Sequence, residues 1–454
     1  MPTLSRSTLP SITTVEGPSY DLDKVNIGVL HMGLGAFHRA HQAVFFDNVL
    51  RKGNSNFGVC AVSQRSPLVA DTLAEQDCLY TVNASDHAVE RPRIIGSIRE
   101  SAYFPRDEQR LIDLASNPEL RLITITVSEK AYLQSLPERL SLLLHSRFLT
   151  GGAPLAIISC DNLPSNGEYT HSVIQHAIAN ESSEFKKWVE AHVRFPNSMV
   201  DRIVPAITST RIDQFESKYG YRDLSLITAE PFSEWVIEHD EVEDELIGSG
   251  IRFVNSVAPY ELAKIRLFNG VHSTLAYLGQ LLSIEYVADV ISDSRISEFV
   301  QRMQEDEIAQ SFITPNDLNL MEYATQIRQR ISNPTLLHRT KQIAMDGSQK
   351  LPQRLFSTAN DLYEKSLPSS RVCLAIAIWL HYLGEAEELD DPMALELQTF
   401  SKSRDSNAAV RGCLTLSFAS QVNPLLYAPI SRWLDLLRTQ SLWKVLSTLE
   451  SENE

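Results

Sequence analysis

Val25-Asn-Ile-Gly-Val-Leu-His-Met-Gly33-Leu-Gly35-Ala-Phe-His38-Arg39-Ala-His41 determines the fold of the first half of this chain. The stretch predicts a short buried strand, a glycine turn and a helix, which together open a dinucleotide-binding βαβ unit. Gly33 permits the tight turn, and Gly35 lets the backbone approach a pyrophosphate at the start of the helix. His38 replaces the third glycine of G-x-G-x-x-G. The prediction of a dinucleotide site therefore depends on the location of Gly33 and Gly35 at the first strand-to-helix junction. We expect the cofactor to bind along Gly33, Leu34, Gly35, Ala36, Phe37, His38 and Arg39.

Strands and helices alternate through the rest of this half. Short runs that are apolar on both faces predict strands of a parallel sheet covered by helices. We expect strands at residues 26–31, 58–62, 122–127 and 155–159, with helices at 68–75 and 108–115 between them. Residues 225–228 and 251–254 are expected to be later strands of the same sheet.

After about residue 256 the pattern becomes helical. Helices are expected at 258–282, 296–313, 318–331, 371–383, 391–397 and 429–448. The acidic run at 385–391 is expected to be a solvated loop. The sequence therefore predicts an α/β Rossmann-type N-terminal domain (1–256) plus an all-α C-terminal domain (257–454) that carries substrate-binding and catalytic residues.

Composition excludes several function classes. A net charge of −16 argues against a nucleic acid or an anionic membrane as partner. No apolar run reaches the ~18 residues that a membrane span needs, and the N-terminus is expected to be a loose polar arm rather than a signal peptide. The five scattered cysteines are typical of reduced thiols in a cytoplasmic protein. We expect a monomer or small homo-oligomer acting on a small molecule.

A second stretch, Lys264-Ile-Arg-Leu-Phe-Asn269-Gly-Val-His272, predicts the chemistry. On an α-helix, with Lys264 at 0°, His272 falls at ~80° and Asn269 at ~140°. Glu261 falls at ~60° on the same arc, among apolar neighbours. A buried lysine can act as a base, asparagine can hydrogen-bond a developing oxyanion, and histidine can orient a hydroxyl. The alternative is a solvated helix face, but such faces more usually carry Glu and Lys pairs, and Asn and His are poor helix formers.

The two stretches and four further motifs give the chain a resemblance to a known family. It is similar to the polyol-specific long-chain dehydrogenases, the family of mannitol 2-dehydrogenase and fructuronate reductase (mannonate oxidoreductase). The further motifs are Thr126-Val-Ser-Glu-Lys-Ala-Tyr132, Ser159-Cys-Asp-Asn162-Leu-Pro-Ser-Asn166-Gly, Phe195-Pro-Asn-Ser-Met-Val-Asp-Arg202-Ile-Val-Pro and Glu230-Pro-Phe-Ser-Glu-Trp-Val-Ile-Glu238. The resemblance implies a zinc-independent enzyme with a lysine acid/base. The chain accordingly shows no convincing metal-ligand set, and the His38–His41 pair has no partner ligands.

The expected reaction interconverts a secondary alcohol and a ketone. Lys264 would remove the hydroxyl proton as hydride leaves, and return it in reduction. Asn269 and a second asparagine would hold the substrate oxygen, and His272 a substrate hydroxyl. Asn162 follows a strand end, where open α/β sheets place their sites, and Asn166 is its rival or a simple turn residue. Glu261 would relay protons or merely pair with Lys264.

Cofactor choice rests on the end of the second strand. An acidic residue usually binds the adenosine ribose of NAD there, but this chain has Ser63-Gln-Arg65-Ser-Pro. Arg65 could stack on adenine or pair with a 2′-phosphate. The family resemblance favours NAD, and the local chemistry leaves NADP open.

The segment 338–354 bears on the substrate. Where mannitol-type members are expected to carry an arginine, four residues before Asp346-Gly347, this chain has Gln342. The segment resembles the fructuronate reductase branch, in which Lys350 or Arg354 could bind a hexuronate carboxylate. The expected substrate pair is therefore D-mannonate and D-fructuronate. Alternatives are mannitol or another polyol, a phosphorylated polyol held by Arg339, Lys341, Lys350 and Arg354, and a non-catalytic dinucleotide sensor.

Overall fold

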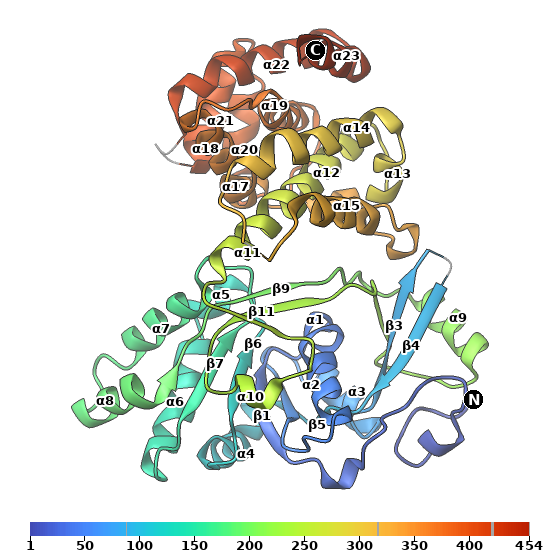
Figure 1. Cartoon of the computed structure of the whole chain (residues 1–454), viewed down its shortest axis with the longest axis vertical. Coiled ribbons are helices and arrows are strands. Elements are labelled where there is room, and N and C mark those ends of the chain that lie inside the picture. The colour runs from blue at the N-terminus through green and yellow to red at the C-terminus, as the bar shows by residue number, and fades with distance from the viewer. Residues whose placement is uncertain (88, 316, 419–421, 454) are drawn as a thin grey trace. The chain divides into compact units, whose positions relative to one another are not determined.

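The computed structural model describes residues 1–87, 89–315, 317–418 and 422–453. The chain divides into two compact units, which we call unit 1 (Met1–Ala258) and unit 2 (Pro259–Glu454). Unit 1 contains the strands, and unit 2 is built from helices (Figure 1).

Unit 1 is built on a six-stranded parallel sheet with strand order β5-β2-β1-β6-β7-β8. In chain order, β2 and β5 are added on one side of β1, and β6, β7 and β8 are then added on the other side of β1. This is the strand order of a Rossmann fold. The expected Rossmann-type domain is thus confirmed. The strands are β1 (Ile27–Met32), β2 (Gly58–Ser63), β5 (Ile98–Tyr103), β6 (Leu122–Ile125), β7 (Leu155–Ser159) and β8 (Val193–Arg194).

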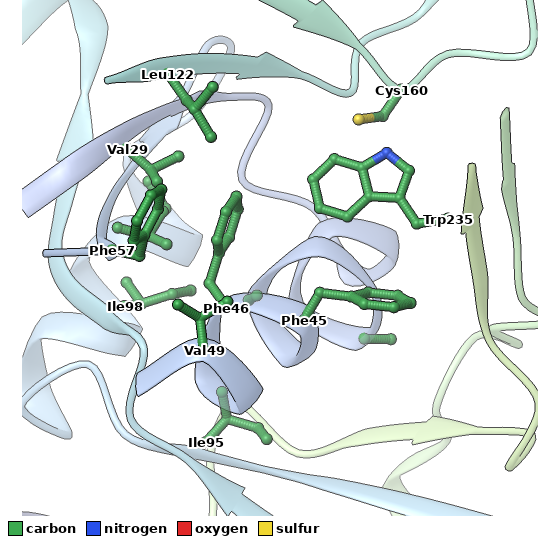
Figure 2. Packing of buried hydrophobic residues seen from close by; sticks show 14 of the residues in the cluster. Val29, Phe45, Phe46, Val49, Phe57, Ile95, Ile98, Leu122, Cys160 and Trp235 are labelled. Atoms are coloured by element: carbon green, nitrogen blue, oxygen red, sulfur yellow. The ribbon is translucent and has the colours of Figure 1, made fainter. Parts of the chain in front are cut away.

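Helices cover both faces of this sheet, which explains why its strands are apolar throughout. Successive strand residues point to opposite faces, so Val29 packs with Phe46 and Trp235 on one side (Figure 2), while Leu30 packs with Leu140 on the other. The first face is covered by α1 (Ala36–Ala40), α2 (Gln42–Arg51) and α3 (Leu68–Glu75). The second is covered by α4 (Phe104–Ser116), α5 (Glu129–Tyr132), α6 (Leu136–Leu149), α7 (Asn166–Ala177) and α8 (Ser183–His192).

Two small sheets complete unit 1, and they correct the expected strand membership. Residues 225–228 and 251–254 do overlap strands, but neither strand joins the parallel sheet. β10 (Ile227–Ala229) pairs with β3 (Tyr80–Asp86), which forms an antiparallel hairpin with β4 (Val89–Ile95). β12 (Arg252–Val254) pairs with β11 (Glu234–Glu238), which pairs with β9 (Ser198–Asp201). An apolar run predicts a strand but not its partner. The helices α9 (Ser209–Tyr219) and α10 (Glu243–Leu246) lie between these strands in the chain.

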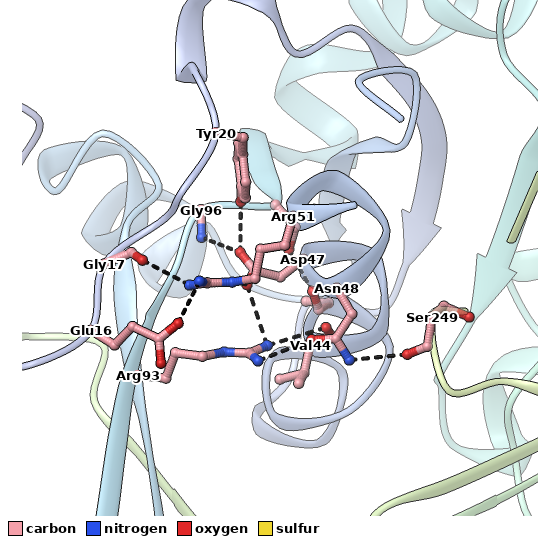
Figure 3. Close-up of polar contacts among 12 residues, drawn as sticks. Glu16, Gly17, Tyr20, Val44, Asp47, Asn48, Arg51, Arg93, Gly96 and Ser249 are labelled. Atoms are coloured by element: carbon pink, nitrogen blue, oxygen red, sulfur yellow. Dashed lines mark hydrogen bonds and ion pairs between the residues drawn. The ribbon is translucent and has the colours of Figure 1, made fainter. Parts of the chain in front are cut away.

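The N-terminal arm is packed, so the expectation of a loose arm is wrong. The cause is a polar network around Asp47, whose side chain is fully buried (Figure 3). Tyr20 donates a hydrogen bond to Asp47 at 2.6 Å, and Arg51 bridges Asp47 and Glu16, both at 2.6 Å. Arg93 of β4 lies 3.3 Å from the same carboxylate. These ion pairs hold a polar segment that hydropathy alone would leave in solvent.

Unit 2 is helical, with no named strand among its described residues, as the sequence predicts. Its central helix is α19 (Ser370–Glu385), which is apolar on every side because it is buried on every side. The other helices are α11 (Ala258–Ala263), α12 (Val271–Leu281), α13 (Val287–Ile291), α14 (Ser294–Arg302), α15 (Leu320–Ile331), α16 (Thr340–Ala344), α17 (Gly347–Leu351), α18 (Ser357–Glu364), α20 (Ala394–Ser401), α21 (Ser406–Phe418), α22 (Tyr427–Thr439) and α23 (Leu442–Asn453).

Three expected helices of unit 2 differ in form, including the one expected at 296–313, where α14 ends at Arg302 and a π-helical segment follows. The helix expected at 429–448 is two helices, α22 and α23, because Gln440 adopts an extended backbone. The helix expected at 258–282 contains a π-helical segment, Lys264–Gly270, between α11 and α12. Two further π-helical segments are Met303–Glu307 and Pro352–Phe356. Among the described residues, no helix is both long and apolar enough to cross a membrane.

Candidate active site

The glycine turn lies at the carboxyl end of β1, beside the point where the strand order reverses. Gly33 has φ +121°, and a Cβ there would lie 1.9 Å from the carbonyl oxygen of Thr126. Only glycine therefore fits at this position. At Gly35 a Cβ would meet nothing closer than the oxygen of Gly33, at 3.8 Å. The open space at Gly35 fits the close approach of a dinucleotide pyrophosphate, as the motif predicts.

The helix after the turn is short, since α1 ends at Ala40 and His41 breaks it with φ −121° and ψ −89°. His38 is completely buried and stacks on His31 with ring centroids 3.4 Å apart. Arg39 donates a hydrogen bond to the carbonyl of Ser225 at 2.8 Å. The side chains of His38 and Arg39 are thus packed within unit 1, whereas Gly35, Ala36 and Phe37 are at least partly exposed.

Arg65 follows the end of β2, where its guanidinium donates a hydrogen bond to Ser128 at 2.6 Å. Both residues belong to loops at the carboxyl ends of the parallel strands. The position suits the adenosine part of a dinucleotide in an open α/β fold.

The two candidate asparagines after β7 differ in their surroundings. Asn166 is buried, and its amide donates to the carbonyls of Asp161 (3.1 Å) and Ser198 (2.8 Å). Its Oδ1 accepts from the backbone N–H of Ser198 at 2.9 Å. Asn166 is therefore a structural clamp at the start of α7. Asn162 is exposed in the preceding loop.

In unit 2, the π-helical segment brings its polar residues into an apolar setting. Lys264 is 6% exposed and His272, in the first turn of α12, is 8% exposed. Phe268 stacks against the His272 ring, with centroids 5.3 Å apart. Asn269 is half-buried, and Glu261 is half-buried one turn before Lys264. Burial of the lysine and histidine excludes a plain solvated helix face.

Cations surround His272. Arg354 donates to the hydroxyl of Ser273 at 2.8 Å, and Gly270 lets the two segments meet, since a Cβ there would lie 3.1 Å from the Arg354 carbonyl. Burial lowers the pKa of His272 well below its ordinary value, and nearby positive groups lower it further. The positive groups are Arg354, Arg330 and Lys350, and the neighbouring ring of His338 also contributes to the shift. His272 is accordingly neutral, as a hydrogen-bond partner of a hydroxyl should be.

Lys350 and Arg354 are both partly buried, and the Lys350 side chain keeps 30% of its surface exposed. The Lys350 ammonium donates to the carbonyl of Met345 at 2.7 Å and lies 3.9 Å from Asp346. Burial lowers the pKa of Lys350, and that of Arg354 to about 10. Two partly buried cations near a neutral histidine form a setting that favours an anion.

The sequence-based view of this segment needs one correction. Asp391, in the acidic run expected to be a solvated loop, accepts hydrogen bonds from the backbone and hydroxyl of Ser348 at 2.8 and 2.6 Å. It thereby anchors the helix that carries Lys350. The carboxylate looked like part of a charged surface run, and only the tertiary fold shows its partner.

The four cations considered for a phosphate separate in the structure. Arg339 pairs with Glu285 at 3.3 Å on the surface, and Lys341 lines a cavity of about 670 Å³ together with acidic residues. Only Lys350 and Arg354 belong to the surroundings of His272. Arg330, whose guanidinium lies 4.6 Å from the centre of the Phe268 ring, and His338, 4.7 Å from His272, were missed because no local pattern marks them.

No group of three or more metal-ligating side chains that could hold a metal occurs among the residues described. A Rossmann sheet with a glycine turn at the end of β1, and a buried lysine and histidine with an asparagine between them, define a dinucleotide-dependent oxidoreductase.

Comparisons with known proteins identify the family. Residues 27–248 match the mannitol dehydrogenase Rossmann domain, and residues 256–419 match the mannitol dehydrogenase C-terminal domain. The chain belongs to the mannitol dehydrogenase family. It is therefore a dehydrogenase that acts on CH–OH groups, which confirms the expected family and enzyme class.

Relatives of the chain include enzymes for both a sugar acid and a polyol. D-mannonate oxidoreductase of Escherichia coli (strain K12) is 32% identical over 456 residues, covering 92% of this chain and 93% of the relative. Mannitol 2-dehydrogenase of Aspergillus oryzae is 30% identical over 449 residues, covering 89% of each chain. The structure of Pseudomonas fluorescens mannitol 2-dehydrogenase, a ternary complex with NAD and D-mannitol, matches 99% of this chain at 27% identity, with a TM-score of 0.87.

Proposed function

We propose that this protein interconverts D-mannonate and D-fructuronate with NAD as cofactor. The two partly buried cations near His272, Lys350 and Arg354, support the choice of a sugar acid, because a substrate carboxylate would pair with them and a neutral polyol would not. The expectation of NAD agrees with the bound cofactor of the Pseudomonas fluorescens relative. When bound, NAD accepts or supplies the hydride.

Lys264 is the proposed acid/base. In the oxidation direction its neutral amine takes the proton of the substrate hydroxyl, and in reduction its ammonium returns that proton to the carbonyl oxygen. Burial of the side chain supports this role, because removal from water favours the neutral amine. Glu261, one turn away, is proposed to pass the proton to solvent.

Asn269 and Asn162 are proposed to donate hydrogen bonds to the substrate oxygen as negative charge develops. The clamped amide of Asn166 leaves Asn162 as the better candidate in unit 1. His272 is proposed to bind a neighbouring hydroxyl, and its neutral state supports that role. Gly33 to Arg39 and Arg65 are the proposed cofactor-binding residues.

The test compares acids with neutral substrates by NADH absorbance. D-fructuronate and D-mannonate should be turned over better than fructose and mannitol. Lys350→Met should raise the KM for the acid about 10- to 10²-fold, since a hydrogen bond to a charged group contributes about 1.5–3 kcal/mol. The KM for mannitol should barely change. Lys341→Met, which removes an exposed lysine from the same segment, is the matched control.

The alternatives give different results in the same assay. A clear preference for mannitol, or an equal effect of Lys350→Met on both substrate types, would favour a polyol dehydrogenase such as mannitol 2-dehydrogenase. NADH binding without turnover of any hexuronate or polyol would favour a dinucleotide sensor.

A further inference from the structure

Two motifs of unit 1, residues 126–132 and 159–167, meet at the carboxyl ends of β6 and β7, and Asp161 joins them. Its Oδ1 accepts a hydrogen bond from the backbone N–H of Val127 at 2.8 Å. Its Oδ2 accepts from the hydroxyl of Tyr132 at 2.7 Å. The Tyr132 hydroxyl also lies 2.7 Å from Ser159 Oγ, which belongs to β7. One carboxyl group therefore connects the loop after β7 to the loop after β6 and to α5.

The backbone of Asp161 is held as firmly as its side chain. Its carbonyl accepts from the N–H of Leu163 at 2.8 Å and from the amide of Asn166 at 3.1 Å. Asn162 lies between these fixed points and is itself exposed. The direction in which Asn162 leaves the sheet is thus set by the contacts of the residue before it.

We propose that Asp161 is a positioning residue for the reaction: through its hydrogen bonds with Val127 and Tyr132 it fixes the loop that presents Asn162. The inference rests on the function proposed above, in which Asn162 binds the substrate oxygen. Asp161 itself needs no contact with substrate.

The surroundings of this carboxyl act on its pKa in opposite directions. Burial raises the pKa of Asp161 to about 7, although the hydrogen bonds from Tyr132 and Val127 oppose that rise. The titratable groups around it are Tyr132 and Glu129 of α5 and the thiol of Cys160, and the charge of Glu129 raises the pKa of Asp161 further. Arginine and lysine do not contribute to the shift.

Protonation of Asp161 would reverse the direction of its hydrogen bond with Tyr132 and keep the bond from Val127. The carboxylate can only accept, so Tyr132 donates to it and Ser159 donates to Tyr132. The neutral acid keeps the bond from Val127 on Oδ1 and carries its proton on Oδ2. It then donates to Tyr132, whose own proton turns toward Ser159. Asparagine at position 161 would reproduce this second arrangement at every pH, since its amide also accepts on one side and donates on the other.

The experiment measures kcat with D-fructuronate and NADH between pH 5.5 and 9 in the wild type, Asp161→Asn, Asp161→Ala and Tyr132→Phe. Asp161→Ala should lower kcat about 10²-fold through misplacement of Asn162, with NADH affinity unchanged. Asp161→Asn should recover most of that loss and should lack the inflection that the wild type shows close to pH 7. Tyr132→Phe, which keeps the ring, should lower kcat while the inflection remains. Glu168→Gln, an exposed carboxylate on α7, is the matched control.

The same inflection in wild type and Asp161→Asn would overturn the inference, as would an Asp161→Ala variant as active as the control. A second measurement needs no turnover: the carboxyl ¹³C resonance of Asp161, assigned by its loss in Asp161→Asn, should titrate close to pH 7. A midpoint near the ordinary ~3.9 overturns the inference and leaves the proposed function standing. Absence of wild-type turnover with every hexuronate and polyol overturns the function, whatever the resonance does.

Discussion

Gly35→Val separates cofactor binding from folding. Gly35 has an extended backbone, with φ −112° and ψ −179°, which any residue adopts. A Cβ at this position meets no atom closer than 3.8 Å, so the valine side chain can be placed without disturbing unit 1. It would instead fill the space that we assign to the pyrophosphate. Each hydrogen bond to a charged group contributes about 1.5–3 kcal/mol, so the loss of two costs about 3–6 kcal/mol. Since 1.4 kcal/mol corresponds to a tenfold change, NADH affinity should fall about 10²- to 10⁴-fold.

The assay is a fluorescence titration with NADH, combined with thermal unfolding. Gly35→Val should unfold at the wild-type temperature. Gly33→Ala provides the contrast, because its methyl group would lie 1.9 Å from the Thr126 oxygen on a backbone with φ +121°. Gly33→Ala should therefore lower the unfolding temperature of the protein, whether or not it also changes NADH affinity. Equal NADH affinity in Gly35→Val and wild type would show that the glycine turn is not the dinucleotide site. The same titration with NADPH measures cofactor preference, which we expect to favour NAD.

Three further variants test the chemistry and the stability of the two units. Lys264→Ala should lower turnover about 10²- to 10⁴-fold at neutral pH while NADH still binds; retention of more than roughly a tenth of wild-type turnover would refute the assigned base. Asp47→Asn should lower the free energy of unfolding by about 3–5 kcal/mol, because it removes the fully buried carboxylate charge with which both Arg51 and Arg93 pair. The exposed Asp113→Asn should change it by less than about 0.5 kcal/mol in the same chemical denaturation series. Burial raises the pKa of Glu307 to about 7, so its stabilising contribution is present below the unfolded value of about 4.3 and is lost as the pH rises through 7. Relative to Glu307→Gln, the wild type should therefore lose stability between pH 5 and 8, and a constant difference would contradict this.

Local patterns in the sequence predicted the parts of the fold that local physics determines. The glycine turn after β1 depends on two residues. Gly33 permits a backbone with positive φ, and Gly35 leaves open space for the close approach of a pyrophosphate. The alternation of apolar strands and helices follows from a sheet covered on both faces. By contrast, β10 and β12 were assigned to the wrong sheet, because pairing depends on segments far away in the chain. The partner of β10 is β3. The hairpin β3–β4 is hard to predict from hydropathy, because polar residues such as Thr81 and Asn83 are buried in it.

The polar contacts that position site residues are equally hidden from a sequence. No pattern in the sequence marks Asp161, which precedes Asn162. In the structure, both of its carboxyl oxygens accept hydrogen bonds that hold that loop. Asp391 was grouped with a surface acidic run, yet it anchors the helix of Lys350. In each case the donor lies at least 29 residues away in the chain. Residue type suggests what a carboxylate can do, but only the fold determines which donor it meets.

The π-helical segment differs from the regular helix on which the proposed site residues were first placed. On a regular α-helix, Lys264 and Asn269 would be separated by ~140° around the axis. A π-helix instead forms its hydrogen bonds between residues five apart, so residues at that spacing lie on nearly the same side. The widened turn from Lys264 to Gly270 therefore aligns the proposed base with the proposed oxyanion donor more closely than the expected helix would. The segment carrying Arg354 is π-helical too, and Gly270 packs against its backbone. Two helices thus depart from regular α geometry where the candidate residues lie, although apolar periodicity alone would have favoured regular turns in both.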